Sequence, residues 1–389
     1  MRNIVGQTPR GDDFFPRDTI ANRIYRRLSA GENVYLAAPR RVGKTAIMRH
    51  LEDKPRENYE FKYIITESVD NATDYFKRLL ESLHRLKSLP RKSLDAIGGF
   101  LRKIKGVKIG LEGVGFELDN AEKSEYFAEL KGLMEKLDTG GTKVVIMIDE
   151  FPQTVKNILE KNDAEAAKQF LQLNREIRHL RNENVGFILT GSIGLPMVAE
   201  QLDATVHIND LSVIEVPPLN RQEARAFTTR LLNYENVRHA HDAIDYLLDK
   251  IEWFVPFHIQ LVVQELIDEH LDTGEPVNNA TVDNAFDKIA DRRNDIYFAH
   301  YYSRLKGTFP DGRQHAFALA LLEELAQENA RSAQQIDAIA AAHHLENYGL
   351  VLRTLEFDGY IFRHDDGNKT FYRFTSPVLR LWWRTYVKR

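Results

Sequence analysis

The sequence contains no cysteine among its 389 residues, which excludes disulfide bonds, iron–sulfur clusters and thiolate zinc sites. It also lacks a strong excess of either charge: the formal net charge is −4, so the overall charge predicts no nucleic-acid partner. Long apolar runs are missing too, and residues 1–21 carry Arg2, Arg10, Asp12 and Asp13 among short apolar pieces. We therefore expect a cytoplasmic protein without a signal peptide or a membrane span.

What the sequence does contain is a series of short apolar runs, separated mostly by segments with a helical pattern. These runs are Val34–Ala37, Phe61–Ile65, Val144–Ile148, Gly186–Thr190 and Ser212–Val216. Such alternation predicts an α/β fold with a parallel sheet. After residue 218 the pattern becomes helical. We expect a core over residues 1–218, a helical lid over 219–312 and a winged-helix domain over 313–389.

The first run leads into the most informative segment, residues 38–45, with the sequence APRRVGKT. A buried strand, a basic loop and a helix in succession fit the P-loop pattern, although Ala38 stands where the first glycine is usual. A basic turn without function is the alternative. The residues predicted to surround a nucleotide here are Pro39, Arg40, Arg41, Val42, Gly43, Lys44, Thr45 and Ala46.

The residue types in this loop suit triphosphate chemistry. Gly43 allows the main chain to curl so that N–H groups point at a phosphate, and the following helix adds the positive end of its dipole. Lys44 supplies a charge for the β- and γ-phosphates, and the Thr45 hydroxyl is predicted to ligate Mg²⁺. ATP and Mg²⁺ are therefore the expected ligands.

The third run ends in two carboxylates, Asp149 and Glu150. Ligands of open α/β sheets bind at the carboxyl ends of the strands, so we expect both side chains beside the P-loop. Asp149 is predicted to hold Mg²⁺ through water, and Glu150 to orient and deprotonate the attacking water. Ser192, after the fourth run, is a candidate sensor of the γ-phosphate, with simple turn chemistry as the alternative.

Two further segments leave their roles open. Residues 77–108 hold ten Lys or Arg against Glu81 and Asp95, which suits either a phosphate backbone or an ordinary solvated helix surface. A small hairpin is expected over residues 107–118. Phe14 and Phe15 are suited to packing on adenine, and equally to filling the core.

The C-terminal segment from about residue 314 predicts three helices and a hairpin, the order of a winged helix. Its third helix, expected over residues 345–357, carries one arginine against two glutamates, whereas a DNA-reading helix is usually basic. The wing and tail are more basic. We expect a protein contact or structural packing here, with DNA binding as the alternative.

Six segments together resemble the archaeal-type P-loop ATPases, which are related to AAA+ origin-recognition ATPases and to the signal-transducing STAND switches. The segments are FFPR (14–17), APRRVGKT (38–45), VVIMIDEFP (144–152), ILTGSIGL (188–195), PPLNRQEA (217–224) and RFTSPVLRLWW (373–383). The resemblance implies ATP hydrolysis by a core module with a lid and a winged helix. It also makes Phe15, Arg17 and Pro256 candidate nucleotide contacts.

The sequence departs from that family's pattern where an arginine finger is expected. No arginine lies between Ser192 and Asp210, and none lies close to Pro256 in the lid. Arg175, Arg178 and Arg181 are the candidate substitutes. Because a finger is worth ~10³–10⁵ in rate, we expect slow hydrolysis and a switch that engages a protein partner, with oligomerisation open. The alternative is an ATP-dependent DNA-binding loader.

Overall fold

The computed structural model describes residues 1–389 except 87–88, 107–119, 181, 290–293, 368 and 388–389. The described residues form two compact units. Unit 1 comprises Met1–Phe15, Ala38–Gly43 and Pro217–Arg389, and unit 2 comprises Pro16–Ala37 and Lys44–Val216. The three-domain division at residues 218 and 312 stays a prediction.

Unit 2 is built on a five-stranded parallel sheet with the order β2-β3-β4-β1-β5. The strands are β1 Asn33–Ala37, β2 Tyr59–Ile65, β3 Lys143–Asp149, β4 Val185–Thr190 and β5 Leu211–Glu215. Strand β3 is buried from Val144 to Asp149, as expected for a parallel strand covered on both faces. The predicted α/β fold with a parallel sheet is confirmed.

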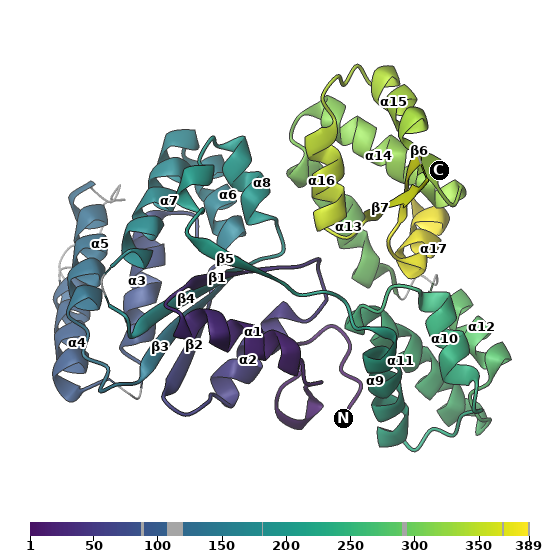
Figure 1. Ribbon diagram of the computed structural model, residues 1–389, viewed down its shortest axis with the longest axis horizontal. Helices are drawn as coiled ribbons and strands as arrows, with labels where there is room; N and C mark the ends of the chain where they lie inside the picture. Colours follow the sequence, from purple (N-terminus) through teal and green to yellow (C-terminus); the bar gives the residue numbers. More distant parts are fainter. Residues whose placement is uncertain (87–88, 107–119, 181, 290–293, 368, 388–389) are drawn as a thin grey trace. The chain divides into compact units, whose positions relative to one another are not determined.

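Helices cover both faces of this sheet (Figure 1). On one face lie α1 (Asp18–Ser29) and α2 (Lys44–Asp53), and on the other lie α3 (Ala72–Leu83), α6 (Phe151–Lys161), α7 (Ala164–Arg178) and α8 (Leu195–Gln201). The apolar stripe of α1, Ile20, Ile24 and Leu28, is buried. Such a stripe, repeating every three to four residues, is what fixes this amphipathic helix on the sheet.

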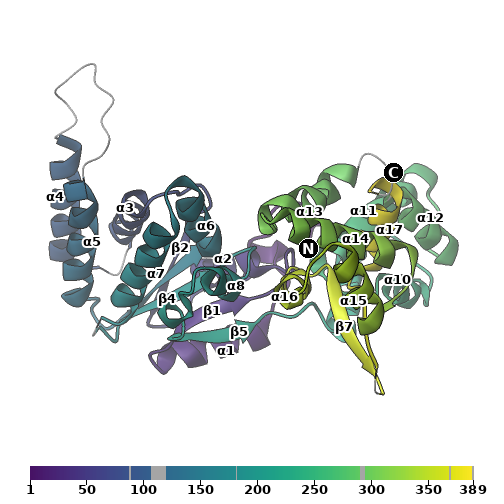
Figure 2. The ribbon, with the colours of Figure 1, turned by 90° about the horizontal axis from the view of Figure 1, so that it is seen from above.

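Helices α4 (Arg91–Gly106) and α5 (Asn120–Glu135) lie side by side and pack against α3 (Figure 2). They belong to the long connection between β2 and β3. Arg91 and Lys92, in the middle of the basic stretch, begin α4 and are exposed, and both predicted roles of the stretch stay predictions. The hairpin predicted for residues 107–118 lies outside the described residues.

Unit 1 contains the helices that follow β5. They are α9 (Arg221–Tyr234), α10 (Ala243–Ile251), α11 (Pro256–Thr273), α12 (Asn279–Ile289) and α13 (Asp295–Thr308). The predicted capping box opens α9: the Asn220 side chain accepts from the Glu223 N–H, and Glu223 accepts from the Asn220 N–H. Helix α13 was not predicted, because the apolar residues Ile296 and Tyr302 are exposed and interrupt the helical spacing of its buried residues.

The winged-helix segment completes unit 1. Its elements are α14 (Gly312–Gln327), β6 (Arg331–Ser332), α15 (Ala333–Ala342), α16 (Gly349–Phe357), β7 (Ile361–Asp366), β8 (Lys369–Phe374) and α17 (Pro377–Tyr386). The strands form an antiparallel sheet with the order β6-β8-β7. Tyr360 and Trp383 lie in the core, and the Tyr360 hydroxyl donates to the Tyr301 carbonyl of α13 at 2.7 Å.

Candidate functional site

The chain leaves the sheet after β1 and enters α2 at Lys44, as the P-loop pattern predicts. Gly43 has a backbone φ of +99°, which residues with a Cβ atom rarely adopt. This backbone conformation therefore favours glycine at position 43. Ala38 is not among the residues with positive φ, and alanine therefore costs no backbone strain in place of the usual first glycine. Both Lys44 and the Ala46 behind it are buried.

Strand β3 brings Asp149 to the start of α2. The Thr45 hydroxyl donates to Asp149 Oδ2 at 2.8 Å, and the Glu150 N–H donates to Oδ1 at 3.0 Å. The carboxylate is only 3% exposed. Burial, followed by the nearby charge of Glu150, raises the pKa of Asp149, while Thr45 and Lys44 are among the groups that oppose this. The predicted pairing of Thr45 with Asp149 is thus present within unit 2.

Glu150 occupies a constrained position at the start of α6. Its φ is +59°, an uncommon left-handed conformation for a residue with a side chain. Its Oε2 accepts two hydrogen bonds from Ser192, one from the N–H at 2.9 Å and one from the hydroxyl at 2.8 Å. Ser192 therefore contacts the predicted base directly. The prediction that it senses a γ-phosphate remains a prediction.

Gly191 makes this contact sterically possible. A Cβ at this position would lie 2.6 Å from Pro152 Cδ and 3.5 Å from Glu150 Cα. Real Cβ atoms do not approach other atoms to 2.6 Å, so only glycine lets the end of β4 lie this close to the start of α6. The neighbouring Thr190 hydroxyl donates to the Leu36 carbonyl of β1 at 2.9 Å, which fixes the same strand end on its other side.

Sequence reasoning missed Tyr63, whose hydroxyl donates to Asp149 Oδ2 at 2.8 Å. Burial, with Asp149 next, raises the pKa of Tyr63, so this hydroxyl remains a donor at neutral pH. The Arg49 guanidinium lies 3.6 Å from the centre of the tyrosine ring. In the sequence Tyr63 is one more strand residue. Only the β2–β3 register, which pairs Ile65 with Asp149, reveals its role.

The P-loop arginines lie among residues of unit 1. The Arg41 guanidinium is 3.9 Å from the centre of the Phe257 ring. Burial lowers the pKa of Arg40, and the neighbouring cation Arg304 lowers it further. Burial lowers the pKa of Arg41 as well. Pro39 and the buried Val42 complete the described loop, and the contacts of these residues with a nucleotide remain predictions.

Three residues named by the resemblance have clear structural roles. The Phe15 ring is partly exposed and packs edge-on against Phe227 with 5.3 Å between ring centres. The buried Arg17 precedes α1, and its carbonyl accepts from the Ile20 N–H at 3.0 Å. Pro256 is the first residue of α11, a position that suits proline. Their roles as nucleotide contacts also remain predictions.

The candidate finger arginines differ in what the structure shows of them. Arg178 binds Asp210 in a bidentate pair, with distances of 2.7 Å from Nε and 2.8 Å from NH2, and its side chain is 2% exposed. This buried ion pair holds α7 to the segment that precedes β5 within unit 2. Arg181 lies outside the described residues. Arg175 is half-buried on the same helix.

Other kinds of site find little support in the described part of the chain. Over these residues, no helix combines the length and the apolar character needed to cross a bilayer. Nor does any group of three or more His, Asp or Glu side chains gather there in a way that could hold a metal ion by itself. Thr45 and Asp149 offer two neighbouring oxygen atoms, the ligand type that suits Mg²⁺.

The fold and this site define the chain as an α/β protein of the P-loop NTPase class, followed by helical and winged-helix segments. A structure of similar fold is the Walker-type ATPase of Pyrococcus abyssi, with a TM-score of 0.64 and 15% identity over 99% of this chain and 100% of that one. Another is the ORC2 protein of Aeropyrum pernix in its ADPNP–ADP complexes, with a TM-score of 0.54 and 13% identity over 96% of this chain and 95% of that one.

These likenesses confirm, at the level of the fold, the resemblance to archaeal P-loop ATPases and origin-recognition ATPases. No family model matches the sequence, and a search of curated proteins likewise finds no match.

Proposed function

We propose that this protein binds and hydrolyses ATP with Mg²⁺ and acts as a molecular switch. The observation that carries the proposal is the convergence of Lys44, Thr45, Asp149 and Glu150 at the ends of β1 and β3. The proposal is supported by a similar fold in a solved Walker-type ATPase and in a solved ORC2 protein bound to ADPNP and ADP. Each of the four groups then has the role that its chemistry suits.

Lys44 neutralises the β- and γ-phosphates, and the Thr45 hydroxyl together with Asp149 holds Mg²⁺. The raised pKa of the buried Asp149 fits this role, because a carboxylate that lacks a full counter-charge is ready to accept a cation. The bound ion supplies further positive charge next to the phosphates. Glu150 orients and deprotonates water.

Ser192 provides the link from nucleotide state to catalysis. Its N–H and hydroxyl hold the Glu150 carboxylate in the structure described here. A γ-phosphate is a stronger acceptor for these donors because of its charge, so ATP competes with Glu150 for Ser192. Glu150 is then released toward the water, and the change is passed to lid and winged helix, where a protein partner binds.

The first test is nucleotide binding and steady-state hydrolysis by two variants. Lys44→Ala should lose ATP binding, while Glu150→Gln should bind ATP and lose turnover by about 10²-fold or more, the range of general-base catalysis. Lys54→Ala and Glu160→Gln, which change exposed residues of unit 2, are the matched controls. Normal turnover by Glu150→Gln would refute the catalytic assignment.

DNA binding is the second candidate function, favoured by the exposed basic residues Arg91 and Lys92 of α4 and by the basic wing. Helix α16 argues against DNA binding, because a DNA-reading helix is usually basic. Arg353 is the only basic residue of α16, and Glu356 balances its charge. Hydrolysis should be measured with and without duplex DNA over a range of salt. Stimulation with a steep salt dependence would establish this candidate.

A further inference from the structure

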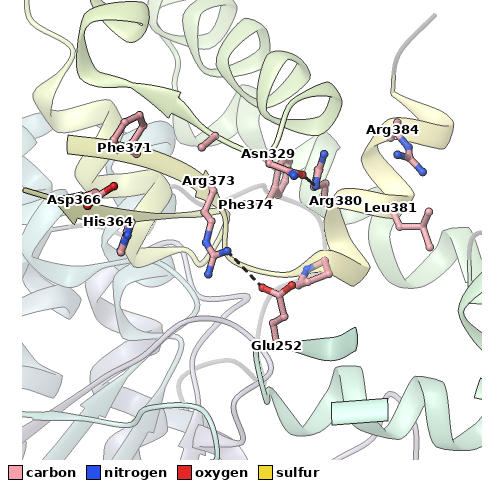
Figure 3. Close-up of a pocket in the computed structure, with 12 residues that line it drawn as sticks. Glu252, Asn329, His364, Asp366, Phe371, Arg373, Phe374, Arg380, Leu381 and Arg384 are labelled. Carbon is pink, nitrogen blue, oxygen red and sulfur yellow. Dashed lines mark hydrogen bonds and ion pairs between the residues drawn. The ribbon is translucent and has the colours of Figure 1, made fainter. Parts of the chain in front are cut away.

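A groove of about 560 Å³ opens in unit 1 between the wing, α17 and the end of α10 (Figure 3). The hairpin contributes His364 and Asp366 from β7 and Phe371 and Arg373 from β8, and His364 is paired with Phe371 in the strand register. Helix α17 contributes Pro377, Arg380, Leu381 and Arg384. None of these residues belongs to the nucleotide site.

The groove offers cations to a ligand. Arg373 and Arg384 are exposed on its walls. Arg380 is instead engaged by the fold, since its Nε donates to the Ala326 carbonyl at 3.2 Å and its NH1 to Asn329. Burial, followed by repulsion from the Arg384 charge, lowers the pKa of Arg380. An anion between them would relieve this repulsion.

One carboxylate already binds in the groove, and it comes from the chain itself. Glu252 lies 3.6 Å from Arg373 NH1, with both side chains about half exposed (Figure 3). Glu252 follows α10 with φ +54°, a conformation in which residues with side chains are strained. An exposed pair of this kind contributes little stability, so an external carboxylate can replace Glu252 at small cost.

The rest of the lining is apolar. Phe371 and Leu381 are partly exposed, and Phe374 and Pro377 lie beside them. Cations next to aromatic and aliphatic side chains match a peptide that carries carboxylates around an apolar anchor. They do not match a nucleic-acid backbone as well, because Asp366 and Glu252 stand among the lining residues and would repel phosphates.

We propose that this groove binds an acidic segment of a partner protein, whose carboxylate replaces Glu252 on Arg373 and extends to Arg384 while an apolar side chain enters beside Phe371 and Leu381. This proposal rests on the proposed switch function in one respect: the groove is the surface on which the partner of the switch binds. The groove itself is formed by described residues of unit 1 alone.

The test is fluorescence anisotropy of the full chain with a labelled peptide in which glutamates flank a phenylalanine and a leucine. Arg384→Glu should weaken binding by about tenfold or more, the loss expected for one charge-assisted contact. Glu252→Gln should strengthen binding, because the competing carboxylate is removed. Arg363→Glu is the matched control and should change little, since Arg363 lies on β7 but does not line the groove.

Further measurements separate the remaining explanations. Arg384→Gln, checked by circular dichroism, replaces Arg384→Glu if that variant does not fold. A peptide with lysines in place of the glutamates should not bind. Absence of binding by the acidic peptide, or weaker binding in Glu252→Gln, overturns the proposal, as does duplex DNA binding that depends on Arg384.

ATP hydrolysis is measured on the same samples. Peptide binding without hydrolysis would refute the ATPase function alone.

Discussion

At the scale of single residues, the burial of Asp149 favours its neutral form, whereas a bound cation favours its ionised form. Asp149 is buried beside Glu150, and its carboxylate is needed where a cation is expected. Its pKa is raised in the folded state, so the folded protein binds the proton more tightly than the unfolded chain does. Ionisation of Asp149 therefore lowers the free energy of unfolding as the pH rises through this raised pKa.

We predict that Asp149→Asn abolishes hydrolysis and yet stabilises the nucleotide-free protein at neutral pH. The amide oxygen can still accept from Thr45 and Tyr63, and removal of the buried charge outweighs the loss of the Glu150 N–H bond to the other oxygen. A rise in the melting temperature of roughly 2–4 °C is expected for about 1 kcal/mol. Calorimetry without nucleotide measures it, with the exposed Asp272→Asn as control. A destabilised Asp149→Asn protein would contradict this account.

At the scale of elements, the contact between β4 and α6 fixes the position of the base. We predict that Gly191→Ala costs about 1–3 kcal/mol of stability, the usual cost of overpacking, because the added methyl meets the rigid ring of Pro152. The shift should also move Glu150, so kcat should fall more than nucleotide affinity. Gly132→Ala is the control, since a Cβ there meets nothing within 4 Å. Equal kcat in the two variants would exclude the positioning role of Gly191.

Prediction from sequence succeeded where one local pattern fixes the outcome. The run that ends at Asp149 and the box formed by Asn220 and Glu223 are such patterns. It does not reach contacts between distant segments: Ser192 contacts Glu150 because β3 and β4 are neighbours in the sheet. Arg178 was a candidate finger because no pattern reveals its pair with Asp210.

Helix α6 was not predicted either. Its Phe151-Pro152 start continues the strand-like run of β3 in the sequence, although proline there is typical of a helix start.

At the scale of the whole molecule, two histidines, the buried His258 and the partly buried His300, make stability depend on pH. Burial, with Arg41 next, lowers the pKa of His258 to about 3, and burial with Arg40 next lowers that of His300 to about 3. Each folded-state pKa lies below the ordinary value of 6.5, so the unfolded chain binds these protons first. The stabilisation is complete above pH 6.5 and is lost as the pH falls toward 3.

We predict that the free energy of unfolding falls by about 1.4 kcal/mol per pH unit for each of these histidines below pH 6.5. Denaturant titrations between pH 7 and pH 5 measure the slope. His258→Gln should reduce it, and the exposed His241→Gln should leave it unchanged. The same slope in all three proteins would show that other groups cause the acid sensitivity.

The strand order also bears on how this protein can vary. Strand β4 is hydrogen-bonded to β1 on one side and to β3 on the other, so it sets the separation between the strand that leads to Lys44 and the strand that ends at Asp149. Helices α4 and α5, in the connection from β2 to β3, pack against α3 and lie outside this strand pairing. Changes in the length of α4 and α5 can therefore accumulate, and diversify the surface of these helices, without altering the distances between Thr45, Asp149 and Glu150.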